Sequence, residues 1–120
     1  MIRSLVTATV LSVALFSAAS AQQQTWVAIA SDGAGLYGAA VGMATREAAE
    51  ASAIGQCGVY CSLKFTAQAS CVAYAFSGTG RAEGFGAGPT LPPVEQQAWS
   101  ECNANVPANS CSVRTAQCFP

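Results

Sequence analysis

The feature of this sequence that most constrains its fold is an internal repeat with an offset of 45 residues. Corresponding positions in the two copies are Val27 and Val72, Gly33 and Gly78, Thr45 and Thr90, Glu50 and Glu95, Ala53 and Ala98, and Cys57 and Cys102. A slip of one residue in the glycine-rich segment aligns Gly38 with Gly84. Because a repeat of this kind represents one supersecondary unit, we predict two copies of the same unit, at about residues 26–70 and 71–118.

Each copy has the pattern of two strands, a helix and a third strand. The runs VAIA and VAYAF are rich in strand-forming residues, and a glycine-rich turn follows each of them. Thr45 can cap the helix REAAEASAIGQC, and Pro92 with Pro93 can open the helix of the second copy. We therefore predict an α+β fold, a small disulfide-stabilised domain of two tandem ββαβ-like repeats.

The first 21 residues are typical of a secretory signal peptide. Arg3 supplies a positive charge, residues 5–16 are mostly apolar, and Ala19-Ser20-Ala21 is a cleavage pattern of small residues. Cleavage there leaves residues 22–120, which are enough for one domain. We predict a periplasmic or secreted protein that has no membrane attachment after cleavage.

The charge of the exported part excludes one class of partner. Four basic residues stand against six acidic ones, which gives a net charge of 4 − 6 = −2. Nucleic-acid binding needs a basic patch, and the sequence has no cluster of Lys or Arg. The expected partner is therefore a protein, and the sequence leaves the oligomeric state open.

All six cysteines lie in the part that we expect to be exported: Cys57, Cys61, Cys71, Cys102, Cys111 and Cys118. An even number of cysteines in a small exported chain predicts a disulfide framework, and the sequence does not choose among the pairings. Cys57 and Cys61 form a C-x₃-C motif, but the chain has no His and lacks the spacing of a zinc site. We expect no metal and no other cofactor.

Gly33, Gly35 and Gly38 spell the G-x-G-x-x-G pattern of dinucleotide-binding proteins. In those proteins a helix begins within the glycine run, and an acidic residue lies about 20 residues further on. Here YGAAVG alternates like a returning strand, and residues 53–56 contain no acid. We interpret the glycines as the bend of a hairpin and expect no nucleotide.

Residue types suited to catalysis are sparse. The absence of His removes the usual Ser and Cys triads, and Lys64 is expected to be solvated on a strand. The remaining candidates are Asp32 and Glu83, which lie near the two hairpins and could act as paired carboxylates on a cell-envelope polymer. We predict that the protein is not an enzyme, with a small carboxylate-dependent hydrolase as the alternative.

A binding surface near the two hairpins is the other candidate site. Tyr37 and Phe85 occupy equivalent places in the two copies, where exposure to solvent competes with packing in a small core. Together with Asp32, Glu83 and Arg81, they form the predicted binding surface.

The first copy also resembles a known family. The motifs are WVAIA, the hairpin ending YGAAVG, the helix TREAAEASAIGQC, Cys61 with SLKF, and ASCVA. Together they resemble domain of unknown function 4189, a family of exported bacterial proteins. The second copy differs by Pro92-Pro93 and by a longer segment between Cys102 and Cys111. The resemblance implies an exported α+β domain, and it transfers no catalytic residues because the family has no established activity.

These features together predict an exported, disulfide-rich protein-interaction module, such as an inhibitor or an accessory of a secreted effector. The rival functions are the envelope hydrolase and a purely structural role in the cell envelope.

Overall fold

The computed structural model describes residues 24–107 and 109–120, and the predicted signal peptide lies outside the described residues. Unit 1 contains β1 (Trp26–Ser31), β2 (Tyr37–Met43), α1 (Arg46–Cys57) and β3 (Ser62–Gln68). Unit 2 contains β4 (Cys71–Ser77), β5 (Ala82–Gly88), α2 (Leu91–Asn103) and β6 (Ser112–Cys118). This order confirms the predicted α+β fold of two ββαβ units.

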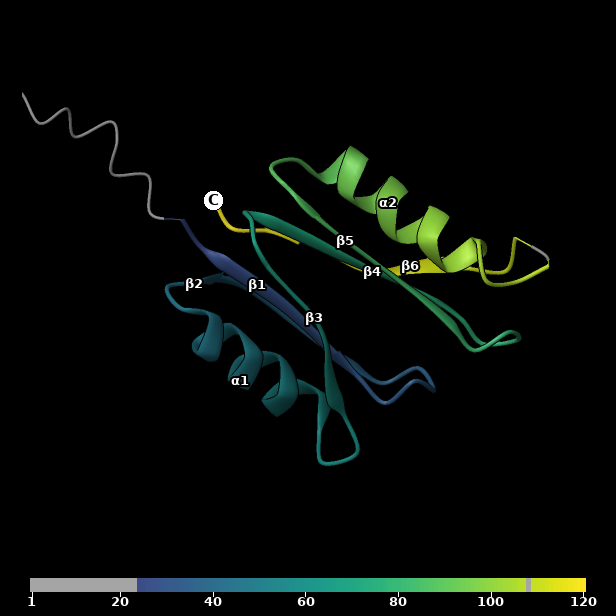
Figure 1. Cartoon of the computed structure of the whole chain (residues 1–120), viewed down its shortest axis with the longest axis horizontal. Helices are drawn as coiled ribbons and strands as arrows, with labels where there is room; N and C mark the ends of the chain where they lie inside the picture. Colours follow the sequence, from purple (N-terminus) through teal and green to yellow (C-terminus); the bar gives the residue numbers. More distant parts are fainter. Residues whose placement is uncertain (1–23, 108) are drawn as a thin grey trace, which may run out of the picture.

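Each unit forms one antiparallel sheet with its first strand in the middle, in the orders β2-β1-β3 and β5-β4-β6. The two sheets lie between the two helices, α1 on one outer side and α2 on the other (Figure 1). The alternation of β1 explains this layering: Val27 and Ile29 join the core between the sheets, whereas Ala28 and Ala30 pack with α1. Each sheet is therefore covered on both faces.

Small residues let each helix approach its sheet closely. A Cβ added to Gly38 would lie 2.0 Å from the carbonyl oxygen of Ala53, and one added to Gly84 would lie 1.9 Å from that of Ala98. A side chain at either position would force the helix backbone to shift, so glycine is strongly favoured there. The same helix–sheet contact thus recurs in both units, including the slip of one residue that aligns Gly38 with Gly84.

A register irregularity also repeats. The pairing of β1 with β3 shifts between Ile29 and Ala30, and the pairing of β4 with β6 shifts between Tyr74 and Ala75. These positions differ by the 45-residue offset of the sequence repeat. A bulge bends a strand and increases its twist, so the two sheets are shaped by the same local feature.

The glycine motif of unit 1 forms the β1–β2 hairpin, as predicted. Gly33 and Gly35 have φ angles of 74° and 118°, values that favour glycine, and the helix begins only at Arg46. Asp32 closes the turn, because its Oδ1 accepts hydrogen bonds from the backbone N–H groups of Ala34 (2.7 Å) and Leu36 (3.0 Å).

Three disulfides use all six cysteines. Cys57–Cys61 and Cys102–Cys111 close the loop after the helix in unit 1 and unit 2, respectively. Cys71–Cys118 joins the start of β4 to the end of β6, where the two residues are register partners. Within residues 24–107 and 109–120, no helix is long and apolar enough to cross a membrane.

Candidate functional site

The predicted aromatic pair, Tyr37 and Phe85, lies half-buried at the edge of the core between the sheets. Phe85 stacks on Phe65 with the ring centroids 5.7 Å apart, and the ring of Tyr37 lies 5.2 Å from that of Tyr74. The hydroxyl group of Tyr37 donates to the carbonyl oxygen of Arg114 at 3.1 Å. Both rings therefore join the two units, and only part of each faces solvent. The prediction that they occupy equivalent places is wrong: Gly38 and Gly84 are the equivalent positions, so Tyr37 corresponds to Glu83.

Glu83 accepts two hydrogen bonds on the same oxygen. The hydroxyl group of Tyr74 donates to its Oε1 at 2.8 Å, and the hydroxyl group of the buried Ser31 donates to the same atom. Burial is the main reason why the pKa of Tyr74 is raised far above its usual value, and the bonded Glu83 carboxylate raises it further. Tyr74 thus stays protonated and positions Glu83 at the junction of the two sheets.

The other predicted residues lie at the turns. Asp32 is engaged in closing the β1–β2 hairpin, and the exposed Arg81 lies in the β4–β5 turn with a φ of 52°. Glu83 accepts a hydrogen bond from Ser31, the residue directly before Asp32, so the structure brings the two carboxylates to the same end of the molecule. Among the described residues, no group of three or more His, Cys, Asp or Glu side chains could hold a metal ion.

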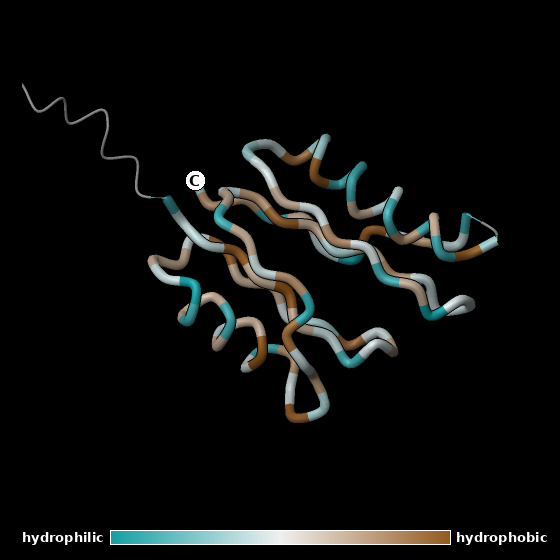
Figure 2. Tube along the Cα trace, in the orientation of Figure 1, coloured by the Kyte–Doolittle hydropathy of each residue, from teal (hydrophilic) through white to brown (hydrophobic). Residues whose placement is uncertain are grey.

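The most exposed large apolar side chains of the described chain lie elsewhere, at a site that sequence reasoning missed. Val59 is 93% exposed and Tyr60 is 86% exposed, and we call this pair the tip. The tip lies in the α1–β3 loop, which projects from the body of the molecule and is hydrophobic at its end (Figure 2). The signal that could have found it is the C-G-V-Y-C sequence, in which two bulky apolar residues lie inside a C-x₃-C motif.

Two backbone hydrogen bonds and a disulfide hold the tip. The N–H of Gly58 donates to the carbonyl oxygen of Ile54 at 3.0 Å and ends α1, with Gly58 at a φ of 115°. The N–H of Cys61 then donates to the carbonyl oxygen of Gly58 at 3.1 Å, which makes Val59 and Tyr60 the central residues of a β-turn. Cys57–Cys61 closes the same loop covalently.

The corresponding loop of unit 2 directs its apolar side chain inward. Val106 packs against the core of unit 2, over Gly80, where an added Cβ would lie 2.1 Å from Val106 Cγ1. The loop is also tethered by polar contacts: Asn103 Oδ1 accepts from the N–H of Cys111 at 3.2 Å, and the hydroxyl groups of Ser110 and Ser77 lie 2.6 Å apart. The loop after α1 therefore exposes its apolar residues, whereas the loop after α2 packs its apolar residue against the core.

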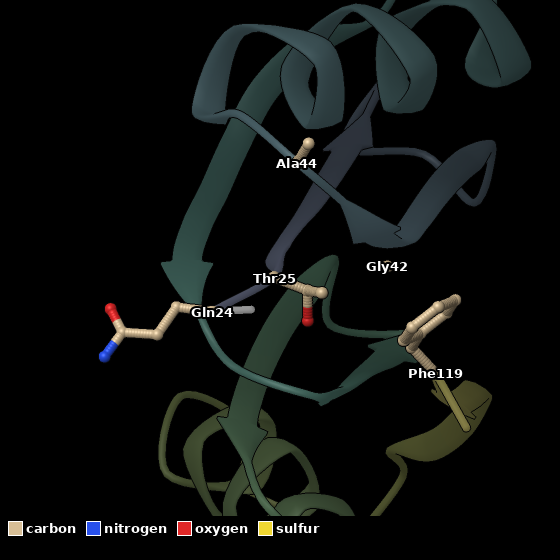
Figure 3. A pocket seen from close by; sticks show the side chains of 5 residues that line it. All are labelled: Gln24, Thr25, Gly42, Ala44 and Phe119. Atoms are coloured by element: carbon tan, nitrogen blue, oxygen red, sulfur yellow. The ribbon is translucent and has the colours of Figure 1, made fainter. Parts of the chain in front are cut away.

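A shallow groove of about 250 Å³ lies at the other end of unit 1 (Figure 3). Its lining consists of Gln24, Thr25, Gly42, Ala44 and Phe119. The ring of Phe119 covers Gly42, where an added Cβ would lie 2.2 Å from Cδ2 of the ring. None of the lining side chains is titratable, so the lining supplies no general acid or base, and its one hydroxyl group, that of Thr25, donates to the carbonyl oxygen of Ala69 at 3.1 Å.

Comparison with known proteins identifies the family of the chain. No curated protein and no solved structure matches the chain significantly. The sequence model of the family described as "Domain of unknown function (DUF4189)" matches residues 26–118, which span both units from β1 to β6. The fold of two ββαβ units with three disulfides is therefore the structure of a DUF4189 domain, and the chain belongs to this family.

Proposed function

We propose that the protein is an exported protein-interaction module and that the tip is its contact with another protein. The observation that carries the proposal is the contrast between the two disulfide-closed loops. Unit 2 shows that this fold can pack the apolar residue of its loop against the core, where Val106 is partly buried, yet unit 1 presents Val59 and Tyr60 to solvent. Two adjacent apolar side chains kept in water by a covalently closed turn are expected at a contact surface.

The rest of the molecule supports the proposal as a scaffold. Both sheets are covered by a helix on one face and by the other sheet on the opposite face, so the tip rests on a well-packed body. The disulfides are consistent with a periplasmic or secreted location, which we include in the proposal. The module would act as an inhibitor or as an accessory of a secreted effector, in either case by occupying a surface of its partner.

Affinity capture with matched variants tests this function. The intact exported protein is immobilised and incubated with the secreted and periplasmic fraction of the cells that produce it, and retained proteins are identified by mass spectrometry. Val59→Ser/Tyr60→Ser should lose the specific partner, because removing a central aromatic anchor costs about 2 kcal/mol, or about 30-fold in affinity. The control Val113→Ser removes an exposed apolar side chain from β6 and should retain the partner.

The result that contradicts the proposal is an identical set of retained proteins for the tip variant and the control. Melting curves of both variants show whether each one is folded. The tip side chains make little contact with the body, so their replacement should leave the melting temperature almost unchanged.

A carboxylate-dependent hydrolase is the second candidate, favoured by the position of Asp32 and Glu83 at one end of the molecule, where Ser31 before Asp32 donates to Glu83. One oxygen of each carboxylate accepts hydrogen bonds from within the protein, which leaves the second oxygen of each for chemistry. Release of reducing ends or peptides from purified peptidoglycan measures this activity. Activity that disappears in Asp32→Asn/Glu83→Gln, with folding intact, would replace the interaction module by an enzyme.

A further inference from the structure

We infer that the partner is a protein with a preformed, uncharged apolar pocket, and that the tip enters this pocket as a rigid wedge of two side chains. The inference rests on the proposed function and adds the chemistry of the partner and the mode of recognition. Shape, backbone conformation, charge and covalent closure each point to it.

The shape of the tip requires a concave partner. Val59 and Tyr60 are neighbours at the end of a narrow loop, and the Cα atoms of Cys57 and Cys61 at its base are 5.8 Å apart. A flat surface would contact only one side of each side chain and leave the Tyr60 ring partly solvated. A pocket covers the apolar part of both side chains on all sides and needs one hydrogen-bonding group for the Tyr60 hydroxyl, which is how aromatic anchors contribute most to binding.

The backbone of the tip favours recognition through side chains. Val59 and Tyr60 lie in a turn closed by the hydrogen bond from Cys61 to Gly58, so this segment is not extended. Addition to a partner's sheet, or binding as an extended peptide in a peptidase cleft, needs strand-like backbone on the bound segment. The tip therefore binds as an anchor and does not imitate an extended substrate.

The chain segment that carries the tip has no charged residue. Residues 54–63 contain no Asp, Glu, Lys or Arg, and the first charged residue after them is Lys64 on β3. Ion pairs therefore contribute little to the contact, and binding should depend weakly on salt. The same absence argues against an anionic membrane as the partner, because such membranes attract loops and helices that carry Lys or Arg.

The disulfide prepares the tip for binding. With Cys57–Cys61 closed, the loop has few conformations to lose when a partner binds. Opening the ring frees Val59 and Tyr60 before binding, and both must then be ordered in the complex. We expect about tenfold weaker binding for Cys57→Ala/Cys61→Ala, since ordering side chains and loops at an interface reduces affinity.

A photo-crosslinking experiment on the full-length protein tests the inference. Tyr60 is replaced by the photoreactive aromatic residue benzoylphenylalanine, and the exported fraction is irradiated. The crosslinked protein is then purified, its contact peptides are mapped, and its Kd for the wild-type protein is measured at about 50 mM and about 500 mM NaCl. Vesicles of phosphatidylcholine with phosphatidylglycerol are the membrane probe, and benzoylphenylalanine at Glu95 on α2 is the control position.

The inference predicts crosslinks to an apolar pocket, a change in Kd of less than about threefold between the two salt concentrations, and about 30-fold weaker binding by Tyr60→Ala. Contact peptides from a flat or charged surface, a Kd that rises more than about tenfold with salt, or undiminished binding by the ring-opened variant would overturn it. So would crosslinking to vesicle lipid or to a second copy of this chain. If the ring-opened variant does not fold, the change of Kd with salt and the mapped crosslinks still test the inference.

The two proposals fail in different ways. Capture of a partner that depends on the tip but responds strongly to salt refutes the uncharged pocket and leaves the interaction module intact. Capture that does not depend on the tip at all, with no crosslink from position 60, refutes the proposed function and the pocket together.

Discussion

Removing the three disulfides one at a time should destabilise the protein, and the loss of stability should increase with the length of the chain segment that each disulfide closes. Cys71–Cys118 spans 47 residues, Cys102–Cys111 spans 9, and Cys57–Cys61 spans 4. In the chain-entropy model, a crosslink stabilises the fold by restricting the unfolded chain, and its effect grows with the logarithm of the loop length. The expected losses are about 4, about 2.6 and about 1.9 kcal/mol for the 47-, 9- and 4-residue spans, respectively.

The largest of these losses should be easy to measure. A domain of this size has a free energy of unfolding of about 5–15 kcal/mol, so losing Cys71–Cys118 removes a large fraction of it. With a shift of about 4–8 °C per kcal/mol, the pair of Cys→Ala substitutions at Cys71 and Cys118 should lower the melting temperature by about 15–30 °C. Opening Cys57–Cys61 should lower it by about half as much, which leaves a folded protein for the binding experiment.

The assay is urea unfolding of the three double Cys→Ala variants, followed by tryptophan fluorescence under non-reducing conditions. The chain-entropy explanation is refuted if the three losses are equal, or if opening Cys57–Cys61 costs the most. A thiol titration of each variant controls for reshuffling, because the four remaining cysteines should stay unreactive.

Two further predictions concern the core and the junction of the sheets. Gly84→Ala should lower the free energy of unfolding by about 1–3 kcal/mol in urea titrations, because the new Cβ would overlap the carbonyl group of Ala98. The control is Gly55→Ala in α1, where the new Cβ has open space, and it should raise the free energy of unfolding by about 0.5–1 kcal/mol. Tyr74→Phe removes the donor to Glu83 and should cost about 1 kcal/mol at neutral pH. Because the pKa of Tyr74 is higher in the folded state than its usual 10.0, the unfolded chain releases this proton first, and wild-type stability should fall as the pH rises above 10.0. A Tyr74→Phe protein that loses stability over the same pH range as steeply as the wild type would contradict the role given to Tyr74.

Much of the fold could be predicted because the same sequence pattern occurs in both copies of the repeat. A glycine at the same place in both copies, such as Gly38 and Gly84, indicates a close contact that both units share. The Thr45 cap could be predicted because capping depends only on the residues next to it in the sequence. The Thr45 side chain accepts a hydrogen bond from the N–H of Ala48 at 3.1 Å, as expected of an N-cap. In the second copy Thr90 makes no such bond, and the prolines of the first turn open the helix.

The candidate site was harder to predict, because exposure depends on the packing of the two units. In an isolated sheet, Tyr37 and Phe85 would face solvent. In the protein, the other unit partly covers both of them. Val59 and Tyr60 have the composition of core residues, and only the turn after α1 shows that they leave the body. Hydrophobicity and periodicity describe single elements, so they cannot show which face a second sheet covers.

The apolar layer between the two sheets has a consequence for the origin of the repeat. A single ββαβ unit would leave Val27, Ile29 and Phe65 in water on the face that its twin now covers. A half-length ancestor would thus have been stable only as a pair of identical subunits related by twofold symmetry. Joining two such units in one chain makes that association intramolecular, and the two halves can then differ, as the loops after α1 and α2 do.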